Sequence, residues 1–104
     1  MGIALFASGA SAQSSAVGRE LFMDPAKGNC DACHAVGASL PAAKRKIGSD
    51  LSNIQSRYPD KTRLRADIWE LGARMAETVM PAYGKNRILT ETEIDALVNY
   101  VQTL

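Results

Sequence analysis

The pentapeptide Cys30-Asp31-Ala32-Cys33-His34 constrains the fold of this chain more than any other feature of its sequence. A Cys-x-x-Cys-His run is the attachment signal for a c-type haem. Two thiols three positions apart can reach the two vinyl groups on one edge of the porphyrin, and the imidazole that follows then falls beneath the iron. Because Cys30 and Cys33 are the only cysteines of the chain and His34 is its only histidine, we predict one covalent haem c held by these three residues.

Three other kinds of site could use the same residues. A thioredoxin-like redox pair needs a preceding strand, whereas residues 24–29 are rich in turn formers and contain no β-branched residue. A structural zinc site needs four ligands, and the chain has three Cys and His residues in all. A disulfide between Cys30 and Cys33 would not require the adjacent histidine. Haem attachment is the hypothesis that uses all three residues.

The amino terminus predicts export. Residues 1–12 are small or apolar and carry no charge, and they end in Ala10-Ser11-Ala12. This small-x-small pattern is typical of a signal peptidase site, with cleavage before Gln13. We interpret residues 1–12 as the tail of a secretory signal peptide, with a disordered tail as the alternative. The segment is too short to span a membrane. We therefore expect a periplasmic protein whose single domain is residues 13–104.

Length and charge narrow the function further. A domain this short buries a marginal core of its own and often relies on a metal or another staple, a role that a buried haem would fill. The 12 Lys and Arg residues nearly balance the 11 Asp and Glu residues, giving a formal net charge of +1. This balance argues against general nucleic-acid binding.

The chain is predicted to be helical, with a loop over residues 36–56. Residues 15–23 form the first expected helix, which Asp24-Pro25 ends. Asp60 is the expected N-cap of the second helix. One apolar face of that helix carries residues at i, i+4 and i+7, namely Leu64, Ile68 and Leu71.

The last helix follows a capping-box pattern, Thr90-Glu91-Thr92-Glu93. Its apolar stripe consists of Ile94, Leu97, Val98, Val101 and Leu104. Gly18 lacks a Cβ, so we expect the first helix to cross the last one there, near Leu97 and Tyr100, with Phe22 filling the adjoining space. No alternating run favours a sheet. The sequence therefore predicts an all-α fold of three to four helices wrapped around one haem.

Met80 is the best candidate for the second iron ligand. It precedes Pro81, which biases it towards an extended conformation in a loop bracketed by Pro81 and Gly84. A thioether on such a stiffened loop can reach the distal face of the iron. Met23 ends a helix, and Met75 is expected in the core in line with Leu71. Lys85 is the main competing donor, but an amine must lose its proton to coordinate a metal.

These features resemble a class I cytochrome c. Three longer stretches, residues 28–34, 57–69 and 78–90, are similar to the SoxX family, the monohaem subunits of the SoxAX complex of bacterial thiosulfate oxidation. The resemblance implies thioether bonds at Cys30 and Cys33, proximal ligation by His34 and distal ligation by Met80. Two departures concern loop stiffness. Gly48-Ser49-Asp50-Leu51 stands where relatives commonly have Gly-Pro to supply a carbonyl for the proximal His Nδ1–H, and Ala82 stands where a second proline is common.

The ligands indicate electron transfer. Iron held by His and Met has no open position, and sulfur raises its potential. Resemblance to SoxX implies a heterodimer with a SoxA-like dihaem subunit, which carries the site where thiosulfate is coupled to a carrier-protein cysteine. This chain would accept the released electrons and pass them to a downstream cytochrome c or another acceptor. It would thus be the electron-transfer subunit of an L-cysteine S-thiosulfotransferase-type complex, with no catalytic residue of its own. The alternatives are a free cytochrome c shuttle to a terminal oxidase, and an enzyme or gas sensor in which Met80 dissociates.

Several surface residues have more than one interpretation. The expected docking surface is the exposed haem edge, with apolar contacts including Val36 and Ala82 and a basic rim. Trp69 is a core residue or an electron relay, and if it lies near the haem its indole N–H could donate to a propionate. The basic residues are solvated, partners of the propionates or docking residues. They are Lys44, Arg45, Lys46, Arg57, Lys61, Arg63 and Arg65.

Overall fold

The computed structural model describes residues 15–37 and 46–104, and within these ranges the chain is helical and contains no strand. The α-helices are residues 15–23, α2 (Lys61–Glu70) and α3 (Glu91–Val101). Three short 3-10 turns, η1 (Cys30–Ala32), η3 (Ile54–Ser56) and η4 (Leu71–Ala73), lie between them. The predicted all-α fold is confirmed. The proposed signal segment, Lys44 and Arg45 lie outside the described residues.

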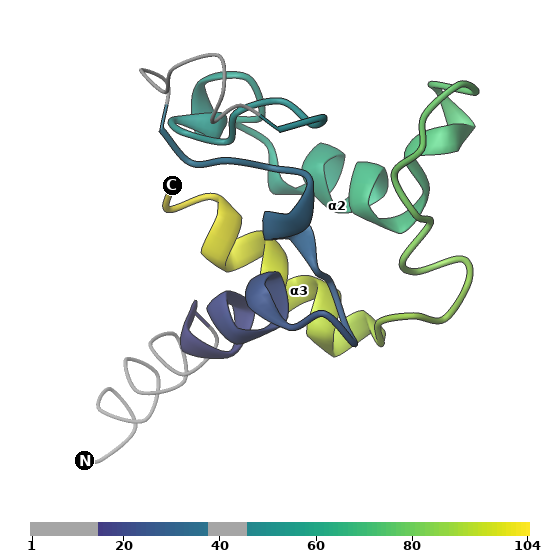
Figure 1. Cartoon of the computed structure of the whole chain (residues 1–104), viewed down its shortest axis with the longest axis horizontal. Coiled ribbons are helices and arrows are strands. Elements are labelled where there is room, and N and C mark those ends of the chain that lie inside the picture. Colours follow the sequence, from purple (N-terminus) through teal and green to yellow (C-terminus); the bar gives the residue numbers. More distant parts are fainter. Residues whose placement is uncertain (1–14, 38–45) are drawn as a thin grey trace.

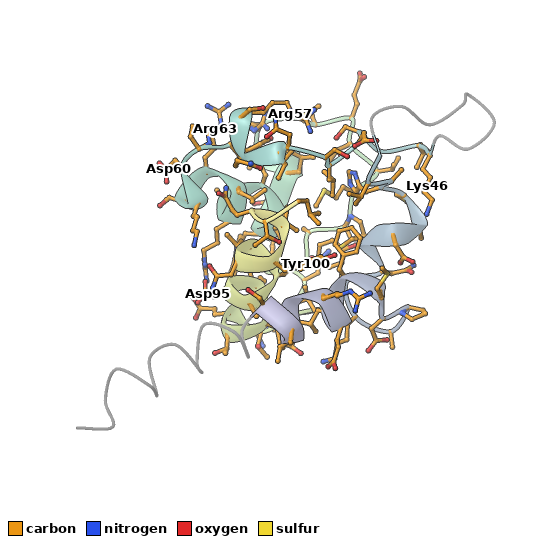
Figure 2. The ribbon with its side chains drawn as sticks, turned by 90° about the vertical axis from the view of Figure 1, so that its left-hand side faces the viewer. Lys46, Arg57, Asp60, Arg63, Asp95 and Tyr100 are labelled. Carbon is orange, nitrogen blue, oxygen red and sulfur yellow. The ribbon has the colours of Figure 1, made fainter. Side chains whose placement is uncertain are left out.

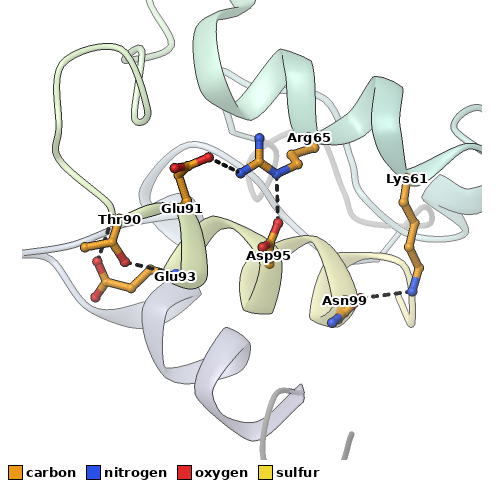
Figure 3. A network of polar contacts seen from close by, with 7 residues as sticks. All are labelled: Lys61, Arg65, Thr90, Glu91, Glu93, Asp95 and Asn99. Carbon is orange, nitrogen blue, oxygen red and sulfur yellow. Dashed lines mark hydrogen bonds and ion pairs between the residues drawn. The ribbon is translucent and has the colours of Figure 1, made fainter.

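Local capping fixes where α2 and α3 begin. The Asp60 carboxylate accepts a hydrogen bond from the backbone N–H of Thr62 at 2.8 Å. The Thr90 hydroxyl accepts from the Glu93 N–H at 3.1 Å, and the Glu93 carboxylate accepts from the Thr90 N–H at 2.9 Å, which completes the capping box (Figure 3). Both predicted N-caps are confirmed, because each side chain satisfies a donor that the helix itself leaves free.

The amino-terminal helix crosses α3 at Gly18, as predicted (Figure 1). A Cβ at Gly18 would lie 2.2 Å from the carbonyl oxygen of Ala96 and 2.6 Å from the Cβ of Tyr100, so only glycine permits this approach. Beside the crossing, Phe22 meets Tyr100 edge-to-face with ring centroids 5.5 Å apart. Phe22 and Leu97 are both fully buried, which places the centre of the core here.

Helices α2 and α3 are joined by polar contacts on their exposed sides (Figure 3). Arg65 donates from Nε to Asp95 at 2.7 Å and from its terminal nitrogen to Glu91 at 3.3 Å. Lys61 donates to the side-chain oxygen of Asn99 at 2.9 Å. Lys61 and Arg65 therefore both make polar contacts with α3.

The remaining basic residues are spread over the surface. Arg57 and Arg63 lie near the start of α2, and Lys46 lies on the other side of the view (Figure 2). Arg57 donates to the carbonyl oxygen of Asp50 at 2.8 Å, and Lys46 donates to the carbonyl oxygen of Asp31. The described basic side chains therefore do not form one continuous patch.

The second helix is shorter than the apolar spacing suggested. Its backbone leaves helical geometry at Glu70 (φ −162°, ψ 85°), and η4 follows. Leu64 and Ile68 are buried, but Met75 is 49% exposed. The prediction that Met75 continues the Leu71 face into the core is therefore wrong, because the helix on which that face depends has already ended.

Candidate functional site

The helices enclose two adjoining cavities that share much of their lining. The inner cavity has a volume of about 120 Å³ and is lined mainly by apolar core residues, together with Cys30, His34 and Met80. The outer cavity, of about 360 Å³, shares those three residues and adds Cys33. All four predicted site residues therefore line this pair of adjoining cavities, although Met80 lies about fifty positions after Cys30 in the sequence.

The His34 imidazole is oriented from behind by the backbone. Its Nδ1 lies 2.8 Å from the carbonyl oxygen of Ser49, and because a carbonyl can only accept, Nδ1 carries the proton. Nε2 is thereby left as the nitrogen with a free lone pair. The segment Gly48-Ser49-Asp50-Leu51 therefore supplies a carbonyl acceptor, although it lacks the proline that relatives commonly have there.

Gly48 packs directly against the same ring. A Cβ at Gly48 would lie 2.6 Å from His34 Cε1 and 2.7 Å from His34 Nδ1. It would also lie 2.7 Å from the carbonyl oxygen of Cys33, which accepts the Gly48 N–H at 2.7 Å. The absence of a side chain at Gly48 therefore allows this loop to close over the back of the imidazole.

The two cysteines form no disulfide and lie in different surroundings. Cys30 opens η1 and is half-buried beside the core, whereas Cys33 is exposed. Burial, followed by the nearby charge of Asp31, raises the pKa of the Cys30 thiol to about 12. Asn29, with φ 51°, turns the chain into η1, and the N–H groups of Cys33 and His34 both donate to the Cys30 carbonyl oxygen. This tight turn presents both sulfurs close to the cavities.

Met80 is the methionine best placed to bind the same group as His34. Its backbone N–H donates to the Thr78 hydroxyl at 3.1 Å, and its side chain is partly buried against the core. Met75 lines only the outer of the two cavities, and Met23 is exposed. Lys85 is exposed and bound to Glu70 at 2.8 Å, and this hydrogen bond raises the pKa of its ammonium group. Lys85 is therefore held in the form that cannot coordinate iron.

A polar cluster centred on the buried Asp67 lies beside the cavities and was missed by sequence reasoning. Asp67 on α2 is 7% exposed and accepts from the Tyr58 hydroxyl at 2.6 Å. Arg74 donates from Nε to Asp67 at 2.8 Å and from a terminal nitrogen to Tyr58 at 2.7 Å. The hydrogen bond from Arg74, followed by that from Tyr58, holds the pKa of the Asp67 carboxyl below its usual value against the opposing effect of burial. No short sequence motif marks this cluster, since its members come from a loop, α2 and the segment after η4.

Trp69 lies away from the two cavities. It lines a surface groove with Arg65 and Glu70, and the Arg65 guanidinium carbon is 5.6 Å from the ring centroid. The indole also meets Gly84, where a Cβ would lie 2.0 Å from the ring. Trp69 does not line either cavity, so its position does not support the predicted propionate contact.

The sequence matches the cytochrome c family over residues 15–104, and the chain belongs to this family. A comparison with curated proteins found no similar sequence. Membership implies a covalent haem c and an electron-transfer function. The residues present fit a haem c, with two thiols three positions apart, an oriented imidazole, a thioether and an apolar wall.

Among residues 15–37 and 46–104, no three His, Cys, Asp or Glu side chains are grouped to hold a metal ion. No helix in those ranges is long and apolar enough to cross a membrane.

Proposed function

We propose that Cys30 and Cys33 attach the haem and that His34 and Met80 are its two axial ligands. The observation that carries this proposal is the shared lining of the inner cavity by Cys30, His34 and Met80. When bound, haem c supplies a one-electron couple. Two protein ligands leave no position open to oxygen or substrate, and the Ser49 carbonyl keeps the imidazole in one orientation. Such a site favours electron transfer over substrate activation.

Replacing Met80 by alanine is expected to leave the haem covalently attached but to remove the distal ligand. The red-edge absorption band of ferric haem with methionine ligation should disappear, and the reduction potential should fall because sulfur favours the reduced iron. Optical spectra and redox titration of the purified holoprotein measure both effects. Met75→Ala is the matched control, because Met75 lines the outer cavity but not the inner one. Survival of the band in Met80→Ala, or its loss in Met75→Ala, would show that the assignment is wrong.

We further propose that the chain is the SoxX-like electron-transfer subunit of a periplasmic SoxAX-type complex. Support comes from residues 28–34, 57–69 and 78–90, which carry the resemblance, and from the saturated pair of ligands. In this role the chain accepts electrons released when a SoxA-like dihaem subunit couples thiosulfate to a carrier-protein cysteine. It passes them to a downstream cytochrome c. Residues 1–12 support export to the periplasm.

The proposed docking surface is the mouth of the outer cavity. Exposed Cys33 lies there with three exposed apolar side chains, Ile47, Met75 and Val79. Ile47 is 78% exposed and Val79 is 79% exposed, and a group of exposed apolar side chains at one site is typical of a protein-binding surface. Val36, expected at this edge, is also exposed, whereas Ala82 is half-buried. Arg74 lines the outer cavity, and Lys46 precedes Ile47 in the sequence.

The subunit role makes a clear biochemical prediction. The holoprotein alone should not oxidise thiosulfate, because its cysteines are used for attachment and both axial positions are filled. Adding a SoxA-like dihaem subunit and a carrier protein should produce sustained reduction of an electron acceptor. Val79→Asp should weaken association with the dihaem subunit, whereas Val17→Asp, an exposed valine on the amino-terminal helix, should not. Thiosulfate oxidation by the chain alone would refute the subunit role. Failure to associate with any dihaem partner would favour the free cytochrome c shuttle.

A further inference from the structure

The loop that carries Met80 is tied directly to the segment that carries the cysteines. Tyr83, three residues after Met80, donates a hydrogen bond from its hydroxyl to the carbonyl oxygen of Gly28 at 2.5 Å. Gly28 lies two residues before Cys30, and the bond is buried although its partners are 55 positions apart in the sequence. This contact therefore joins the two parts of the chain that face each other across the cavities.

Gly28 is itself firmly held. Its N–H donates to the carbonyl oxygen of Leu21 at 3.1 Å, at the end of the amino-terminal helix. A Cβ at Gly28 would lie 2.7 Å from that oxygen and 3.1 Å from the sulfur of Cys30. The acceptor of the Tyr83 hydroxyl is thus fixed between the helix and the first attachment residue.

Tyr83 is equally well fixed. It is 7% exposed, and its carbonyl oxygen accepts from the N–H groups of Ile88 at 3.0 Å and Leu89 at 3.1 Å. Burial raises the pKa of its hydroxyl to about 12, so the group stays a donor over the physiological range. The ring lines both cavities together with Met80, Cys30 and His34.

The next residue anchors the loop in the opposite direction. Gly84 packs against the Trp69 ring, and its N–H donates to the Trp69 carbonyl oxygen at 3.2 Å. The loop is therefore held between α2 and the segment at Gly28. Between Met80 and Tyr83, Pro81 has a fixed φ angle, and three residues span at most about 10 Å. The position of Tyr83 consequently limits where the Met80 sulfur can lie.

We propose that Tyr83 is a positioning residue for Met80, whose hydroxyl holds the methionine loop at the distance from the Cys30 segment that axial ligation requires. This inference rests on the proposed ligation by His34 and Met80. Without the Tyr83–Gly28 bond, the loop keeps its anchor on Trp69 but loses its tie to the attachment segment. Met80 then spends more time detached from the iron, although the helices remain packed.

Competition with imidazole measures this detachment in the ferric holoprotein. Imidazole enters when Met80 leaves, and its binding abolishes the red-edge band. We expect Tyr83→Phe, which removes one oxygen atom and keeps the ring, to bind imidazole about tenfold more tightly than wild type, as expected for the loss of one buried hydrogen bond. Its band should also be lost on heating at a lower temperature than the helical circular dichroism, with the two transitions further apart than in wild type.

Tyr58→Phe is the matched control. It also removes a hydroxyl from the wall of both cavities, but the partners of that hydroxyl, Asp67 of α2 and Arg74 just after η4, belong neither to the Met80 loop nor to the Cys30 segment. Tyr58→Phe should lower the stability of the protein with little change in imidazole affinity. If Tyr83→Phe binds imidazole as weakly as wild type, or no more tightly than Tyr58→Phe, the inference about Tyr83 is wrong while ligation by Met80 stands. Absence of the red-edge band from wild type would overturn the ligation and the inference together.

Discussion

Replacing Gly48 by alanine is expected to destabilise the holoprotein by about 1–3 kcal/mol, the usual cost of overpacking a tight site. The new Cβ would lie 2.6–2.7 Å from the His34 ring and from the carbonyl oxygen of Cys33. Neither neighbour is the end of a flexible side chain, since the ring is held by Ser49 and the carbonyl is backbone. Gly48 does not have a positive φ, so the effect comes from the collision and not from the backbone angles that alanine would have to adopt.

Gly48→Val should be more severe and should lower the fraction of protein that carries haem. Denaturant unfolding of the purified holoprotein and the haem content per chain after expression measure the two effects. Gly72→Ala is the control, because the nearest atom to its Cβ would be Thr78 Cγ2 at 4.0 Å. Its stability should stay within about 0.5 kcal/mol of wild type. Equal stability of Gly48→Ala and Gly72→Ala would contradict the close packing of this loop on the imidazole.

Features that depend on neighbouring residues could be predicted from the sequence. The caps at Asp60 and Thr90 are confirmed, because a side-chain acceptor and the N–H that it satisfies lie within three positions of each other. The crossing at Gly18 is confirmed for a related reason. An isolated glycine on an apolar helix face lacks the Cβ that would keep a second helix away. In so small a core, the last helix had few other helix faces to pack against.

Features that depend on distant residues could not be predicted in the same way. The Tyr58–Asp67–Arg74 cluster forms only because the chain turns at Glu70 and brings Arg74 back over α2. The same turn exposes Met75, which periodicity alone had placed in the core. The position of Trp69 in the surface groove with Arg65 follows from its packing against Gly84, fifteen positions later in the sequence. Helical spacing carries no information about such contacts.

Replacing Asp67 by alanine is expected to destabilise the protein by about 1–3 kcal/mol near neutral pH, since the Tyr58 hydroxyl would lose its buried acceptor. This loss is below the cost of about 3–5 kcal/mol for breaking a fully buried charge pair, because Arg74 is exposed enough to regain contact with water. Asp67→Asn should retain part of the hydrogen bonding but not the charge. Asp95→Asn is the matched control, as the Arg65–Asp95 pair is exposed and such pairs contribute about 0.2–1 kcal/mol.

The dependence of the free energy of unfolding on pH separates the contribution of the Asp67 charge from that of its packing and hydrogen bonding. Its pKa in the folded protein lies below the usual value, chiefly because Arg74 donates to it, so the charged carboxylate favours folding. This contribution is fully present above the unfolded pKa of about 4 and is lost as the pH falls through the lower folded pKa. The free energy of unfolding of wild type should therefore approach that of Asp67→Asn in acid, while the two differ most near pH ~7. Denaturant unfolding of both holoproteins across this range tests the prediction. A constant difference between them at every pH would mean that Asp67 stabilises the fold by packing and hydrogen bonding, without a contribution from its charge.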